Sequence, residues 1–231
     1  MVNNWLKIIQ DFVVPPVCLL CQAAGVRGGT DLCAECMAEL PRMAAACSTC
    51  AMALPVEGQC GQCQQKPPTF DRTTALFHYQ PPVDWLIQGL KFRAKLTNGR
   101  FLGEQMAEFL AQKQVLTPDL IIPVPLHPQR LRERGFNQAL ELAKPISKAL
   151  AVPLWQHVER IVATEAQSLL PLDKRRNNVK GSFRVNRPLE GARVAIVDDV
   201  MTSGSTIGEL AHVLRLGGAK SIDVFVCARV S

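Results

Sequence analysis

The residues best suited to chemistry lie between Val194 and Leu210, in the segment VAIVDDVMTSGSTIGEL. Its apolar first residues predict a buried strand, and two adjacent carboxylates, Asp198 and Asp199, stand at the carboxyl end of that strand. Ligands of open α/β sheets bind at this end of the strands. We therefore take Asp198 and Asp199 as candidate binding and catalytic residues.

A phosphate-binding loop is predicted directly after the acid pair. Gly204 permits a close approach of the backbone, and hydroxyl side chains surround it at the start of the next helix: Thr202, Ser203, Ser205 and Thr206. Free N–H groups, the positive end of the helix dipole and hydroxyl donors together favour a phosphate group. The carboxylates would accept hydrogen bonds from sugar hydroxyls and hold a water on Mg²⁺. The combination predicts a ribose 5-phosphate ligand.

Alternative explanations of this segment account for less of it. The sequence contains neither G-x-x-x-x-G-K-[ST] nor G-x-G-x-x-G, which excludes the two common nucleotide-binding loops. An ordinary turn followed by a helix cap would explain one hydroxyl and one acid, but not the remaining residues.

Cysteine spacing predicts two metal sites near the start of the chain. Eight of the nine cysteines form four Cys-x-x-Cys pairs, separated by eleven, ten and nine residues: Cys18/Cys21, Cys33/Cys36, Cys47/Cys50 and Cys60/Cys63. Two such pairs complete one tetrahedral four-cysteine zinc site, so two structural Zn²⁺ ions are expected. Pairing first with second and third with fourth closes the shortest loops, although spacing alone leaves an interleaved arrangement open.

The alternatives to zinc are disulfides or a redox Cys-x-x-Cys. Disulfides need an oxidising compartment, and the first residues lack the basic stretch and cleavage site of an export signal. A redox motif occurs once, at the start of a helix, and does not recur four times. We expect a cytoplasmic protein without a membrane span, because no apolar run approaches the roughly 18 residues required.

Composition divides the chain into two parts. Residues 1–66 carry 4 basic and 5 acidic side chains, whereas residues 67–231 carry 22 and 15, so the net charge of +6 lies in the second part. Pro67 and Pro68 mark a stiff linker between them. We expect an amino-terminal amphipathic helix and double zinc ribbon over residues 1–66, and a second domain over 67–231.

Strands and helices alternate in the second domain, which predicts an α/β fold with a mainly parallel sheet flanked by helices. We expect strands over 73–79, 119–126, 192–200 and 221–230, and helices over 83–92, 102–114, 136–151 and 205–218. The helix over 136–151 should be interrupted or bounded at Pro145. Cys227 is expected to be a small buried core residue.

The segment VAIVDDVMTSGST resembles the phosphoribosyl pyrophosphate (PRPP) signature of type I phosphoribosyltransferases. Together with the cysteine pairs, IIPVPLHPQRLRERGFNQALELA and QSLLPLDKRRNNVKGSF, it resembles the ComF family, which includes GntX-type proteins. The resemblance implies a phosphoribosyltransferase-like fold. It also implies that Asp198 and Asp199 contact the ribose hydroxyls and that residues 202–206 bind the 5-phosphate.

Three basic segments have less certain roles. By analogy with the transferase fold, the loop containing Val124 and Pro125 would bind pyrophosphate, and guanidinium groups that follow it would assist: Arg130, Arg132 and Arg134. The alternative for these arginines is a solvated helix start with three surface side chains. The loop with Lys174, Arg175 and Arg176 would close over PRPP, bind a nucleic-acid backbone or simply be solvated. Lys91 lies in another basic patch, on a helix face; it would either reach the site or have a surface role, and we expect the surface role.

The resemblance implies a role in competence and in the uptake and use of DNA. Two functions remain: Mg²⁺-dependent transfer of a phosphoribosyl group from PRPP to an unidentified acceptor, or non-catalytic sensing of PRPP or a nucleotide. In the second case the protein would handle single-stranded DNA as an adaptor at the cytoplasmic side of DNA import, with DNA-import proteins as partners. The sequence does not decide whether the protein is an enzyme.

Overall fold

A computed structural model describes residues 17–24, 31–113, 117–162 and 179–230 of the chain. The amphipathic helix expected within residues 1–16 lies outside the described residues, and so do Lys174, Arg175 and Arg176. Among the helices of the described ranges, none is long and apolar enough to cross a membrane.

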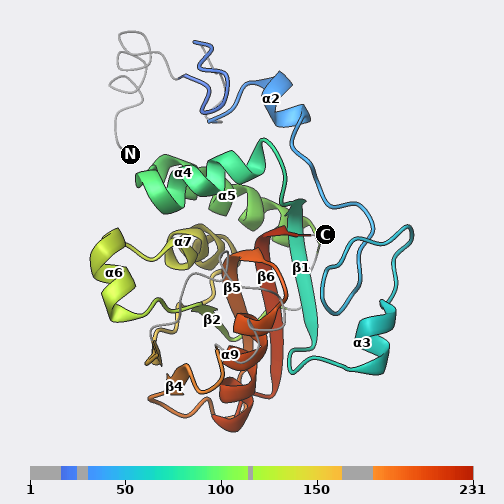
Figure 1. The fold of residues 1–231 in the computed structure, drawn as a ribbon, viewed down its shortest axis with the longest axis vertical. Coiled ribbons are helices and arrows are strands. Elements are labelled where there is room, and N and C mark those ends of the chain that lie inside the picture. The colour runs from blue at the N-terminus through green and yellow to red at the C-terminus, as the bar shows by residue number, and fades with distance from the viewer. Residues whose placement is uncertain (1–16, 25–30, 114–116, 163–178, 231) are drawn as a thin grey trace.

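Four parallel strands form the central sheet, in the order β1-β6-β5-β2 (Figure 1). Their bounds are β1 Arg72–His78, β2 Leu120–Pro123, β5 Arg193–Met201 and β6 Ser221–Arg229. Each of the two central strands contains a continuous buried apolar run, residues 194–197 in β5 and 224–228 in β6, as expected for a parallel sheet covered on both faces. The predicted strands are confirmed.

Helices cover both faces of this sheet. Three pack on one face: α4 Val83–Arg93, α5 Leu96–Gln112 and α7 Gln138–Leu150. The other face is covered by α9, Ser205–Leu216 (Figure 1). Alternation along β5 follows the strand period of two, since Ala195 and Val197 belong to the first core and Val194 and Ile196 to the second. The predicted fold, a parallel sheet flanked by helices, is confirmed.

Helix α7 continues through Pro145, so the predicted interruption at this residue is wrong. Its close neighbour α5 explains how the proline is accommodated. A Cβ atom added at Gly103 of α5 would lie 3.0 Å from both Leu142 O and Pro145 Cγ. Absence of a side chain at Gly103 lets the two helices approach closely at the proline.

Short elements complete the described part of the second domain. Helix α6, Pro128–Arg134, follows β2, and β3 Val158–Arg160 pairs with β4 Phe183–Val185 in an antiparallel ribbon. His127 caps α6 by accepting a hydrogen bond at Nδ1 from Gln129 N, 3.3 Å away. Asn137 caps α7 in the same way through Ala139 N.

The cysteine-rich segment runs along the outer edge of β1. It contains α2 Ala34–Ala38 and α3 Gly61–Gln65. Met43 N donates to Leu76 O at 2.9 Å, and His78 N donates to Pro41 O at 2.9 Å. The segment thereby covers part of a sheet edge that would otherwise present unpaired backbone groups.

Candidate functional site

Asp198 and Asp199 lie at the carboxyl end of β5, and both are buried, at 8% and 3% exposure. Backbone amides fix them, because Asp199 N donates to Asp198 Oδ1 at 2.9 Å and Val200 N donates to Asp199 Oδ1 at 2.8 Å. Burial and the charge of Asp199 raise the pKa of Asp198 to about 8. Two carboxylates held in a buried place need a cation or hydroxyl donors close to them.

Lys91 supplies such a cation. Its Nζ lies 2.6 Å from Asp199 Oδ2, and the attraction of that carboxylate outweighs burial and raises the pKa of the lysine. The expectation of a surface role for Lys91 is therefore wrong. The alternative, that Lys91 reaches the site from a helix face, agrees with helical spacing, because Lys91 follows the buried Ile87 by four residues and so shares its face of α4.

The loop that follows the acid pair has the geometry of an anion site. Gly204 adopts φ +74° as the N-cap of α9, a 12-residue helix, and offers no side chain to cap the first turn. Ser203 Oγ accepts a long hydrogen bond, 3.4 Å, from Ser205 N at the start of the helix. Ser203 is exposed, and its Oγ lies 2.9 Å from Ser205 Oγ. Thr202, Ser205 and Thr206 are half-buried. Backbone N–H groups at the start of α9 and these hydroxyls thus surround one small region beside the acid pair.

Two arginines bring their charges toward the acid pair from other elements. Burial lowers the pKa of Arg134, on α6, and the charge of Asp199 opposes this effect. Burial likewise lowers the pKa of Arg160, on β3, against the charge of Asp198. The charge of Arg130 adds to the lowering at both positions, which places Arg130 in the same electrostatic environment. Sequence reasoning missed Arg160, because only the tertiary fold brings β3 to this region.

Three other residues were predicted to contact pyrophosphate: Val124, Pro125 and Arg132. Arg132 is exposed on α6. Val124 is buried, its N–H donates to Val197 O at 2.9 Å, and its carbonyl accepts from Asn137 Nδ2 at 3.0 Å. Pro125 has no N–H to offer. Contacts of Val124, Pro125 and Arg132 with pyrophosphate stay predictions.

The cysteines gather into two four-sulfur clusters. Within each cluster the sulfur atoms all lie within 4.8 Å of one another: Cys18, Cys21, Cys33 and Cys36 in the first, and Cys47, Cys50, Cys60 and Cys63 in the second. The pairing is sequential, as the loop lengths favoured. Cys21 Sγ lies 3.7 Å from Cys33 Sγ, and Cys50 Sγ lies 3.7 Å from Cys60 Sγ.

Both clusters fit zinc. A tetrahedron with Zn–S bonds of about 2.3 Å has edges of about 3.8 Å, close to the two sulfur distances above. Although burial opposes it, backbone N–H groups of Cys60, Cys50 and Thr49 lower the pKa of Cys47 to about 6. Burial and the neighbouring sulfurs instead raise the pKa of Cys63. A bound dication would compensate the negative charges of neighbouring thiolates, so that all four cysteines of a cluster could be deprotonated together.

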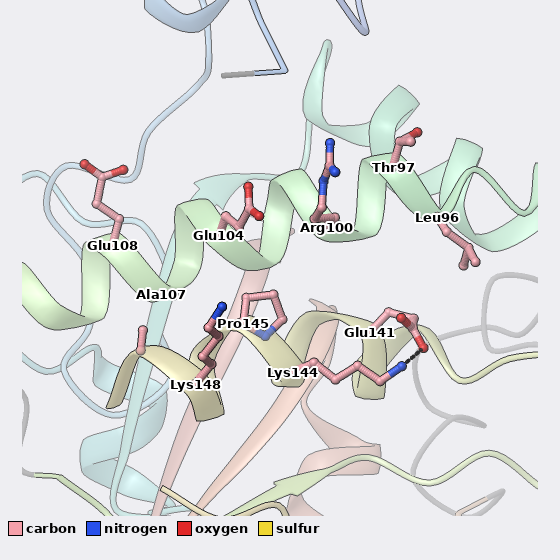
Figure 2. A pocket seen from close by; sticks show the side chains of 11 residues that line it. Leu96, Thr97, Arg100, Glu104, Ala107, Glu108, Glu141, Lys144, Pro145 and Lys148 are labelled. Carbon is pink, nitrogen blue, oxygen red and sulfur yellow. Dashed lines mark hydrogen bonds and ion pairs between the residues drawn. The ribbon is translucent and has the colours of Figure 1, made fainter. Parts of the chain in front are cut away.

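Two cavities open on the described surface. One, of about 920 Å³, lies between α5 and α7, away from the acid pair, and carries three basic and three acidic side chains (Figure 2). These charges balance, and Lys144 and Glu141 pair directly at 2.6 Å. The other cavity, of about 440 Å³, lies between the second cysteine cluster and α9, with Lys66, Ser203, Ser205 and Arg229 among its lining residues.

Comparison with known proteins identifies the cysteine-rich segment and near full-length relatives. The model of the double zinc ribbon domain matches residues 9–64. The DNA utilization protein YhgH of Salmonella typhimurium is 33% identical over 227 residues, covering 94% of this chain and 98% of the relative. Competence protein F of Haemophilus influenzae is 33% identical, with 92% and 96% covered. Competence protein ComFC of Bacillus subtilis is 23% identical, with 92% and 95% covered.

Solved structures with a similar chain path include two phosphoribosyltransferase-type enzymes. The glutamine PRPP amidotransferase of Bacillus subtilis is 21% identical with a TM-score of 0.40, covering 56% of this chain. The chain spans only 26% of the length of that enzyme. The purine phosphoribosyltransferase of Pyrococcus horikoshii is 18% identical with a TM-score of 0.34, and 69% of this chain and 88% of the enzyme are covered.

Proposed function

Because this chain belongs to the ComF family, whose relatives are named for competence and DNA utilization, we propose that it binds PRPP in the use of DNA. The single observation that carries the proposal is the junction of β5 and α9. There a buried acid pair adjoins the start of a helix whose N-cap is a glycine at φ +74°. The acid pair suits ribose hydroxyls, and the start of α9 suits a phosphate group.

In this proposal each part of the site binds one part of the ligand. Residues 202–206 hold the 5-phosphate through backbone N–H groups and hydroxyls. Asp198 and Asp199 accept hydrogen bonds from the ribose 2- and 3-hydroxyls. Because the pKa of Asp198 is about 8, this carboxyl is protonated in part at neutral pH and also donates. Lys91 orients Asp199 through their ion pair at 2.6 Å.

The basic side chains around the acid pair would hold the pyrophosphate group. Arg130, Arg134 and Arg160 surround this region electrostatically, and guanidinium forks suit phosphate oxygens. Mg²⁺ would neutralise pyrophosphate charge when bound, held by the ligand and by waters on the acid pair. Lys91 already occupies Asp199 Oδ2, so direct coordination of the metal by that oxygen would displace the ammonium.

Transfer of the phosphoribosyl group to an unidentified acceptor is the reaction that this site would support. The chain's contribution would be positioning and electrostatics: the loop fixes the 5-phosphate, and the arginines stabilise the charge of the departing pyrophosphate.

A second candidate is a non-catalytic adaptor that senses PRPP or a nucleotide and handles single-stranded DNA at the cytoplasmic side of DNA import. The printed names of the relatives favour it, because they refer to DNA utilization and competence and not to a transferase reaction. Release of pyrophosphate from PRPP with candidate acceptors would favour the enzyme. Binding of PRPP without turnover would favour the adaptor.

Ligand-induced stabilisation tests the proposal. A ligand at 100 times its Kd stabilises the folded state by about 2.7 kcal/mol. PRPP with Mg²⁺ should raise the melting temperature, and ribose 5-phosphate should do so less, because it lacks the pyrophosphate group. The Ser203→Ala, Ser205→Ala variant should weaken both effects, whereas Ser221→Ala, at the amino end of β6 and so at the opposite end of the sheet from the acid pair, should leave them unchanged. Equal shifts in all three proteins, or none, would reject binding at this loop.

A further inference from the structure

Arg229 is a buried cation that the site described above does not use. It ends β6, and only 4% of its surface is exposed. Its guanidinium joins two parts of the chain that lie far apart in sequence. Nη1 donates to Met201 O at 3.0 Å, to Thr202 O at 2.6 Å and to Val230 O, while Nε donates to Cys50 O at 3.0 Å.

These partners connect the second cysteine cluster with the phosphate loop. Cys50 is one of the four sulfur residues of that cluster, and Thr202 begins the loop before α9. Arg229 thus fixes the carbonyl oxygens of the two residues that lead into Ser203 and Gly204. Amide N–H groups that bind a phosphate take their orientation from such backbone constraints.

The charge balance of Arg229 depends on the same cluster. Within the described ranges no carboxylate forms an ion pair with it. Its Nε donates to the backbone carbonyl of Cys50, one of the four sulfur residues of that cluster. Four thiolates around one Zn²⁺ keep a net negative charge, which compensates a buried guanidinium.

We propose that Arg229 is a positioning residue through which zinc at the second cluster holds the phosphate loop in its binding conformation. The second zinc ribbon is then part of the ligand-binding architecture as well as a folding unit. Loss of its zinc would release the Cys50 carbonyl and the compensating charge, and with them the backbone of residues 201–206. The consequence for PRPP rests on the proposed function, whereas the coupling itself does not.

The first cluster provides a matched control. Cys18 packs with Leu32, Leu40 and Phe77 in the core on the opposite face of the sheet. Its segment joins α5, where Arg100 Nη2 lies 2.7 Å from Asp31 Oδ1. No described contact of this cluster reaches the phosphate loop, so removal of the first zinc should leave the loop unchanged.

Hydrogen–deuterium exchange of the full chain, without PRPP, tests the coupling. Two amides report on the loop: Val230 N–H donates to Met201 O at 3.1 Å, and Gly208 N–H donates to Gly204 O at 2.7 Å. The variants are Cys60→Ser with Cys63→Ser for the second cluster, and Cys21→Ser with Cys33→Ser for the first. Zinc content confirms the loss of one ion from each variant.

In the second-cluster variant we expect exchange at both amides to accelerate about tenfold or more, as for the loss of charge-assisted hydrogen bonds. The first-cluster variant should differ from wild type by less than about twofold, within the spread of a remote change. Equal acceleration in both variants, or none in the second, overturns the proposal.

Arg229→Gln keeps both zinc sites and separates coupling from misfolding. It should accelerate the same two amides while it retains two zinc ions per chain, and unchanged exchange overturns the role of Arg229. A titration with PRPP then distinguishes the proposed function from the coupling between the second cluster and the phosphate loop. Failure of wild type to bind PRPP rejects the proposed function, while the exchange result stands by itself.

Discussion

The ion pair between Lys91 and Asp199 gives the sharpest test of the electrostatics of the site. Lys91 Nζ lies 2.6 Å from Asp199 Oδ2, and the two side chains are 22% and 4% exposed. Removal of one partner from a buried ion pair costs about 3–5 kcal/mol, because the other charge is left uncompensated. Since the ammonium of Lys91 is partly exposed, we expect Lys91→Met to cost about 3 kcal/mol of unfolding free energy at neutral pH.

The unfolding free energy lost in Lys91→Met should increase with pH. The folded pKa of Asp198, about 8, is above its unfolded value, so the native state keeps a proton that the unfolded state has lost. The stability of the wild type therefore falls as pH rises from about 4 to about 8. The charge of Lys91 lowers the pKa of Asp198, so its loss raises that pKa further and extends the fall to higher pH.

Urea unfolding of wild type and Lys91→Met at pH 6 and pH 9 measures both effects. We expect a larger loss at pH 9, and the double variant Lys91→Met, Asp199→Asn should recover most of it, because no uncompensated charge remains at residue 199. A loss below about 1 kcal/mol at pH 9, the size of a surface ion pair, would refute this account of the acid pair. A double variant no more stable than the single one would refute it also.

Three further predictions concern the acid pair, the helix packing and the metal sites. Asp198→Asn should stabilise the protein increasingly between pH 5 and pH 8, by at most about 1.4 kcal/mol per pH unit. Urea unfolding at pH 5 and at pH 8 measures this gain, and a gain independent of pH would contradict the raised pKa of Asp198. Gly103→Ala should cost about 1–3 kcal/mol, because the added Cβ meets Leu142 O and Pro145 Cγ at 3.0 Å; an unchanged melting temperature would show that α5 and α7 separate easily. Denaturation with a colorimetric chelator should release two Zn²⁺ per chain, one from each four-sulfur cluster, and a single ion would leave one cluster without its metal.

Local patterns were sufficient to predict the sheet, its helices and the metal clusters. The apolar run before Asp198 and the period of two in Val194–Val197 predict the buried strand, and the structure confirms it. The Cys-x-x-Cys spacing predicts four-sulfur sites, and loop closure favours the sequential pairing that is observed. Each of these features depends on residues close together in the sequence.

Residues that act through tertiary contacts were harder to predict. Lys91, Arg160 and Arg229 lie in segments that also suit a surface, an edge strand or a core strand, and only the fold brings them to the acid pair or the loop. The close approach of α5 to Pro145 of α7 occurs at Gly103, 42 positions earlier in the sequence. The helical face of Lys91 indicated that this residue could reach the site, but no comparable local pattern marks Arg160 or Arg229.

Calorimetric titration of the zinc-loaded protein with PRPP in Mg²⁺ tests the central claim most directly. The control is the Asp198→Asn, Asp199→Asn variant, which keeps the size of both side chains and removes their charges. The account predicts saturable binding by the wild type with one PRPP per chain, and a large loss of affinity in the variant. Absence of binding by the folded wild-type protein, or equal binding by the variant, would contradict it.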